Sequence, residues 1–301
     1  MNTMFEHTSS LWIRYSSYEW KKGKDGNLYL TPAKEAALEI YDPLRDAQQI
    51  VVDALNIGRM CIGKKPDDEI QKMIQDFAVK HGLFGLMTAL PTTPKFMDYE
   101  AVYLPKNPFI KAETMDTMEY LELFFPFDKL DVVKRGSSSV WNLEGDSSML
   151  AFVATMSSRP MTVNMSFQRE YAERYDWLKQ QFTDWMFTFS TSFFYYQDYD
   201  KYNEDTRNLL RKSMSAYDHN APTYHIALLD KPTIVWDFHS LLLGIQMMFS
   251  FMLTDQKTPL RLCRNCQKVF IASRPSNHFC SPGCKNRYNV YKNRAKKKGN
   301  E

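Results

Sequence analysis

Cysteine is scarce in this chain and unevenly placed. Five cysteines occur in 301 residues, and four of them lie between residues 263 and 284, which leaves Cys61 alone in the rest. This distribution excludes a disulfide framework. Close cysteine pairs in a chain that starts without a basic and apolar leader are typical of metal sites in a reducing cytoplasm, so we expect a cytoplasmic protein.

Long hydrophobic runs are also missing. The most apolar segment, 241–253, contains Gln246 and is shorter than the roughly 20 residues that a membrane span requires. We therefore predict that it is a core helix. The chain as a whole is 44% hydrophobic and 14% aromatic, which excludes global disorder.

Motifs of common enzymes are absent. The six histidines are scattered, and neither a His-Glu-x-x-His motif nor a Gly-x-Ser-x-Gly elbow occurs. Gly82 and Gly85 are not followed by the Gly-Lys-Ser/Thr of a phosphate loop, and Cys61 lies between Met60 and Ile62, as an inert apolar residue would. We expect a protein that is not an enzyme. The least favoured alternative is an enzyme in the N-terminal body whose residues converge only in space.

Acidic residues are almost absent from the C-terminal end. Residues 256–301 contain twelve Lys or Arg and one acid, a net charge of +11, whereas 26 basic and 34 acidic residues give −8 over residues 1–255. A basic tail on an acidic body indicates a nucleic-acid partner, and a tail that only increases solubility is the alternative.

The same C-terminal end carries the cysteines in two pairs. The spacing is C-x2-C, 13 intervening residues and C-x3-C, which predicts a closed four-thiolate Zn2+ site on a ribbon and a helix. The candidate ligands are Cys263, Cys266, Cys280 and Cys284. The interval is too short for the catalytic insert of a His-Asn-His zinc nuclease, and four thiolates leave no open position for catalysis. We therefore interpret His278 as a hairpin side chain.

A basic helix is predicted after the second pair. Ser281 suits the N-cap and Pro282 the first helical position. Lys and Arg at this density neutralise phosphates, and asparagine can contact base edges. We predict that double-stranded DNA contacts these residues: Lys285, Asn286, Arg287, Lys292, Arg294, Lys296, Lys297 and Lys298. Single-stranded RNA and an acidic protein surface are the rival partners.

The C-terminal segment resembles the CGNR-type zinc finger of bacterial transcription regulators. The shared residues are Cys263 and Cys266, the run Phe279-Cys280-Ser281, and the signature itself at Cys284-Lys285-Asn286-Arg287, where Lys285 replaces the glycine. The resemblance covers about a fifth of the chain. It implies zinc and DNA binding, and hence a transcription regulator. A single finger buries little surface, which favours a homodimer.

The body is predicted to be mainly helical with small β-hairpins, an α+β class, with the boundary to the finger between residues 255 and 256. Hairpins are expected around Asp25-Gly26, between segments 12–15 and 28–30, and around residues 230–232. Helical periodicity is found over 43–56, 66–81, 115–125, 167–194, 204–217 and 238–253, the last capped by Asp237. Loops are expected within 131–164. The function of the body is predicted to be ligand sensing, partner binding or oligomerisation.

An aromatic stripe follows one face of the predicted 167–194 helix. Its members recur every three or four residues: Tyr171, Tyr175, Leu178, Phe182, Trp185 and Phe189. A stripe of this kind could stack nucleic-acid bases, but packing in the core is the favoured interpretation.

Overall fold

The computed structural model describes residues 7–92, 96–105, 107–127, 168–215, 217, 220–255 and 259–298. The chain divides into two compact units. The first consists of Met1–Asp46, Asp67–Gln180 and His219–Ile245, and the second of Ala47–Pro66, Gln181–Asp218 and Gln246–Glu301. The first combines helices with small, mostly antiparallel sheets, and the described part of the second combines helices with one two-stranded antiparallel sheet, as the predicted α+β class requires. The boundaries between these units do not coincide with the predicted boundary between residues 255 and 256, which stays a prediction.

The first predicted hairpin is correct in its turn and wrong in one strand. Strand β3 (Tyr18–Lys22) pairs with β4 (Leu28–Pro32) across a turn in which Gly26 has a φ of 78°. Glycine adopts this positive φ without steric cost. The predicted strand β2 (Trp12–Tyr15) pairs instead with β5 (Leu38–Tyr41), because the intervening segment 18–22 is the one that a five-residue turn can bring against β4.

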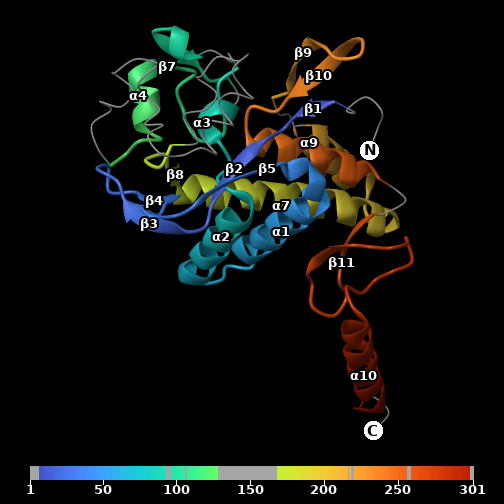
Figure 1. Cartoon of the computed structure of the whole chain (residues 1–301). Helices are drawn as coiled ribbons and strands as arrows, with labels where there is room; N and C mark the ends of the chain where they lie inside the picture. The colour runs from blue at the N-terminus through green and yellow to red at the C-terminus, as the bar shows by residue number, and fades with distance from the viewer. Residues whose placement is uncertain are drawn as a thin grey trace. The chain divides into compact units, whose positions relative to one another are not determined.

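The second predicted hairpin is confirmed. Strands β9 (Thr223–Leu228) and β10 (Pro232–Asp237) are antiparallel, and the short β1 (Thr8–Ser9) adds a parallel strand to β10 (Figure 1). Among its described residues, the first unit also contains the strands β6 (Ala101–Tyr103), β7 (Thr114–Asp116), and β8 (Glu173–Arg174), which extends the β3–β4 sheet.

One predicted helix of the first unit is confirmed and another is shorter than expected. Helix α2 (Asp67–His81) ends at Gly82, whose φ is 85°. The helix predicted over 115–125 is α4 (Thr117–Glu122), because Asp116 caps it by accepting hydrogen bonds from the Met118 and Glu119 amides. The described part of this unit also contains three short helices: η2 (Pro43–Asp46), α3 (Leu86–Ala89) and η3 (Phe96–Asp98).

A buried carboxylate holds the loop between α2 and α3. Glu173 is fully buried and accepts hydrogen bonds from the Phe84 and Leu86 amides, both at 2.9 Å, and from the Tyr171 hydroxyl at 2.7 Å. Burial raises the pKa of Glu173, although these donors oppose the rise. No sequence motif marks this residue.

The first helix of the second unit continues past its predicted end. Helix α1 (Ala47–Ile62) passes through Gly58, which we expected to lie beyond the helix. Gly58 stays helical because its missing side chain lets the backbone of Phe182 come close, and a Cβ atom there would overlap the Phe182 carbonyl oxygen. The glycine therefore serves close packing and does not end the helix.

Two long helices, α7 (Tyr175–Gln197) and α9 (Leu241–Thr254), begin in the first unit and continue into the second. Helix α9 begins later than predicted, because Ser240, and not Asp237, accepts a hydrogen bond from the Leu243 amide at 3.1 Å. Asp237 ends β10 and contacts His225. The second unit also contains η5 (Tyr199–Lys201) and α8 (Glu204–Ser215), which is exposed or half-buried throughout.

The aromatic stripe is core. Helix α7 begins at Tyr175 because the preceding residues form β8, yet four stripe residues beyond that point are at most 2% exposed: Leu178, Phe182, Trp185 and Phe189. The core interpretation is confirmed. The loops predicted within 131–164 lie outside the described residues. Across the described ranges, no helix combines the length and apolar character that a membrane span needs.

Candidate metal centre

A two-stranded ribbon positions the first cysteine pair. Strands β11 (Leu260–Leu262) and β12 (Val269–Ile271) are antiparallel, with Leu262 opposite Val269. Apolar and β-branched residues favour this extended pairing. The connecting turn therefore begins at Cys263, directly after β11.

The turn brings Cys263 and Cys266 to the same side. The Cys263 amide donates to the Lys268 carbonyl at 2.9 Å, and the Gln267 amide donates to the Cys263 carbonyl at 2.8 Å. Gln267 has a φ of 60°, a conformation in which few non-glycine residues are found. This tight reversal is what the C-x2-C spacing predicted.

A backbone hydrogen bond and a helix cap position the second cysteine pair beside the first. The Arg264 amide donates to the His278 carbonyl at 3.0 Å, which aligns the chain before Cys280 with the first turn. Helix α10 (Pro282–Lys298) then begins, and the Ser281 hydroxyl accepts a hydrogen bond from the Cys284 amide at 3.2 Å. The predicted N-cap and helix start are confirmed.

The four sulfur atoms lie within 4.8 Å of one another. Cys266 and Cys280 have a sulfur–sulfur distance of 3.6 Å, and Cys280 and Cys284 one of 3.5 Å. A disulfide has a length of about 2.05 Å, so these contacts are not covalent bonds. Four thiolates at about 2.3 Å from a tetrahedral ion would be about 3.8 Å apart, and the observed spacing fits such an ion.

The charges at the cluster also fit a bound cation. Burial acts to raise the pKa of Cys263, but hydrogen bonds from the Cys266, Cys280 and Asn265 amides lower it to about 6. Burial and the neighbouring sulfurs of Cys284, Cys263 and Cys266 raise the pKa of Cys280 to about 12. Four sulfurs this close cannot all ionise without a positive charge between them, and a metal ion would supply that charge.

A small apolar core supports the cluster. Leu260, Cys263, Val269 and Ala272 are buried, and the ring of Phe279 lies 5.3 Å from that of Tyr288 on α10. The helical spacing of Cys284, Tyr288 and Tyr291 predicts one face toward this core. Tyr291 is instead 63% exposed, because α10 packs on the core in its first turns and then extends beyond the ribbon.

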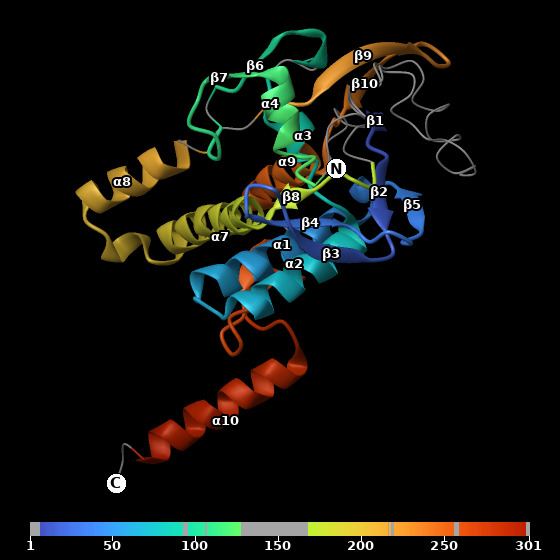
Figure 2. The same ribbon diagram turned by 90° about the vertical axis from the view of Figure 1, so that its left-hand side faces the viewer.

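Helix α10 contains all the predicted nucleic-acid residues. It is one unbroken helix (Figure 2), and the side chains of Lys285, Asn286, Arg287, Lys292 and Arg294 are exposed. For Lys296, Lys297 and Lys298 the structure describes helical backbone alone. Among the described residues, no carboxylate forms an ion pair with Lys285, Arg287, Lys292 or Arg294, which leaves their charges available to a partner.

One residue of the site has no signal in its local sequence. Asn56, on α1, donates from Nδ2 to the Val269 carbonyl and accepts at Oδ1 from the Val269 amide, both at 3.0 Å. The side chain thereby pairs with β12 as a neighbouring strand would. The two residues are 213 positions apart, and an asparagine inside a helix looks like any polar surface residue.

Comparisons of the chain with models of protein families, with curated proteins and with solved structures found no match.

Proposed function

We propose that the four cysteines bind Zn2+ and that α10 is a DNA-binding helix, which makes the protein a DNA-binding transcription regulator. The observation that carries the proposal is an exposed basic helix whose first turn is attached to a four-sulfur cluster. Bound zinc supplies folding free energy and fixes the direction in which the helix leaves the ribbon. The assignment rests in part on the motif resemblance of Cys263, Cys266 and residues 279–287 to CGNR-type fingers.

The basic side chains form two rows along α10. A helix turns by about 100° per residue, so residues seven apart point in nearly the same direction. Lys285 and Lys292 form one row, and Arg287 and Arg294 form the other on the opposite side of the helix. A helix lying in a major groove about 12 Å wide has a phosphate backbone on each side, and each row would contact one of them.

Between these rows, α10 exposes side chains that can contact bases. Asn286, Val290 and Asn293 are exposed in the sector that faces away from Cys284 and Tyr288. Asparagine can form two hydrogen bonds with adenine, and an apolar side chain can contact the thymine methyl group. The two rows would hold the helix on the duplex, and this sector would read the sequence.

The second candidate is a zinc-stabilised module that binds RNA or an acidic protein. Tyr291 is exposed on α10 and could stack on an unpaired base, which favours this alternative. One exposed aromatic residue is a small stacking surface, whereas the paired basic rows fit a duplex. We therefore place duplex DNA first, with a homodimer as the form that would bind it, and an enzyme in the body last.

The arginine row provides the test. We expect Arg287→Ala and Arg294→Ala each to weaken binding to labelled duplex and to reduce the log–log salt slope by about 0.9 for each phosphate interaction that the substitution removes. Arg274→Ala is the matched control, because Arg274 is exposed in the same segment but precedes the helix. Zinc content should be equal in all four proteins. Unchanged affinity in both helix variants would remove α10 from the binding surface.

A further inference from the structure

The second unit contains a pocket of about 290 Å³ that the proposed DNA-binding surface does not use. It is formed by side chains of α7, the end of α9 and the segment 259–278, which contains β11 and β12 and is called the ribbon segment below. Thirteen residues line it, from Phe189 on α7 to His278 beside the cysteine cluster. An engineered cavity of about 150 Å³ holds benzene, so this pocket has room for a ring with a substituent.

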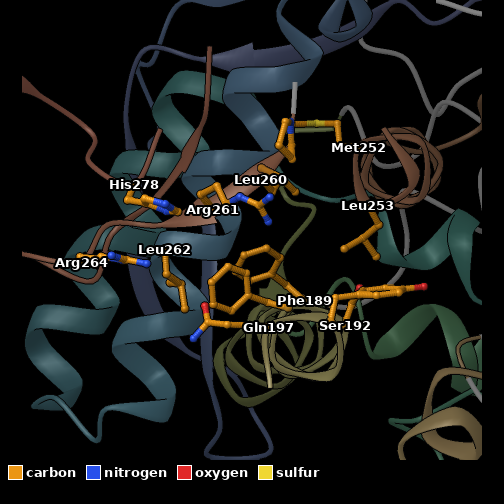
Figure 3. A pocket seen from close by; sticks show the side chains of 13 residues that line it. Phe189, Ser192, Gln197, Met252, Leu253, Leu260, Arg261, Leu262, Arg264 and His278 are labelled. Carbon is orange, nitrogen blue, oxygen red and sulfur yellow. The ribbon is translucent and has the colours of Figure 1, made fainter. Parts of the chain in front are cut away.

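The pocket has an apolar side and a basic side. Figure 3 shows Arg264 and His278 on one side and Met252 and Leu253 on the other, with the Arg261 side chain extending from the first side toward the middle. The ring of Phe189, which is 2% exposed, lies between them. A few polar groups converging on an apolar cavity are typical of sites for small organic ligands.

The two arginines bring positive charge that the surrounding protein does not neutralise. Within the ranges that the structure describes, neither Arg261 nor Arg264 forms an ion pair or donates a side-chain hydrogen bond to another residue. Arg261 is half-buried on β11, where its register partner is Phe270. A guanidinium group binds a carboxylate through two parallel hydrogen bonds, more strongly than it binds a neutral group.

We propose that this pocket binds a small organic carboxylate with an apolar body, held by Arg261 at its charged end and by Phe189 and Leu253 along its apolar part. Arg264 and His278 add further donors, and Ser192 on α7 also lines the pocket. The chemistry excludes cations, and the apolar wall disfavours small inorganic anions. Because Arg264 lies between Cys263 and Cys266, the ligand would contact the ribbon segment itself. The site does not depend on nucleic-acid binding.

Calorimetric titration of the 301-residue chain tests this site. The probes are benzoate, 3-phenylpropanoate and hexanoate, each compared with its neutral amide, together with acetate, which lacks the apolar body. We expect at least one of the three larger acids to bind with 1:1 stoichiometry. Its affinity should exceed that of its amide and of acetate by about tenfold or more, because the amide lacks the charge and acetate lacks the apolar body.

Two variants and a control assign the binding to this pocket. Arg261→Gln should weaken binding of the acid by about tenfold. Ser192→Phe should abolish binding of the acid, because the phenyl ring would fill the cavity from α7. This substitution removes no core side chain. Arg274→Gln, an exposed arginine outside the pocket, should bind as the unmodified protein does. The proposal is overturned if none of the three acids binds with a Kd below about 1 mM. Equal binding of acid and amide, or undiminished binding by both pocket variants, would overturn it as well.

Discussion

Cys263, Cys266, Cys280 and Cys284 place four sulfur atoms within 4.8 Å of one another, with the two pairs brought together by a short ribbon and a capped helix. The amides that donate to the sulfur of Cys263 stabilise its thiolate, the form that binds metal. At the scale of single residues, the cluster has the geometry and the donors of a structural metal site.

Replacing Cys280 tests the metal assignment. We expect the unmodified protein to hold one zinc ion per chain. Cys280→Ser should hold far less, because it lacks one of the four thiolate ligands. Structural zinc contributes about 10–16 kcal/mol to the folding of small zinc domains. Elemental analysis of the purified protein measures this. Cys61→Ala, which removes the cysteine outside the cluster, should keep its zinc. Equal zinc in the Cys280→Ser variant and the unmodified protein would contradict a four-cysteine site.

Glu173 predicts a pH dependence of stability. The ordinary pKa of its carboxyl group is 4.5, and burial raises this pKa in the folded protein. As the pH rises from 4.5 toward the folded value, the unfolded chain releases the proton while the folded chain keeps it. The free energy of unfolding therefore falls with rising pH over that window, by up to about 1.4 kcal/mol per pH unit.

Glu173→Gln removes the titrating group, so its stability should change less with pH above 4.5. Urea denaturation at a series of pH values measures the slope. Glu170→Gln, which changes an exposed glutamate three residues earlier, should keep the slope of the unmodified protein. If Glu173→Gln has that slope too, the buried carboxyl does not titrate as proposed.

At the scale of elements, local signals were predictable and long-range ones were not. The C-x2-C turn, the Ser281 cap and helix α2 follow from residues close together in the chain. Two features depend on segments that are distant in the sequence and that periodicity cannot identify. Strand β2 pairs with β5, and Gly58 stays helical because of its close contact with Phe182. Asn56 is the clearest case in the site, because its partner Val269 is 213 residues away.

The Asn56 contact predicts how firmly β12 is held. Asn56→Ala leaves the Val269 amide and carbonyl without their side-chain partner, and the removal of each hydrogen bond is expected to cost about 1–3 kcal/mol where the group stays buried. Hydrogen exchange at the Val269 amide should become faster, whereas zinc content should not change. Gln49→Ala, an exposed position on the same helix, is the control. Exchange as slow as in the unmodified protein would show that the contact does not hold the strand.

At the scale of the whole molecule, charge is divided along the chain. Residues 256–301 carry +11 and residues 1–255 carry −8. A basic segment is attracted to polyphosphates at long range, and the attraction weakens as salt increases. The acidic remainder would repel the same polyphosphate, so the duplex contact should be confined to the C-terminal end.

The most direct measurement is the binding of labelled duplex DNA and of single-stranded RNA at several salt concentrations, by the full chain and by a version that ends at Asp255. We predict that the full chain prefers the duplex, with a log–log salt slope of about −0.9 for each phosphate contact, and that the truncated chain does not bind it. Duplex binding that survives truncation, or a full chain that binds neither nucleic acid near physiological salt, would contradict the assignment of α10 as a DNA-binding helix.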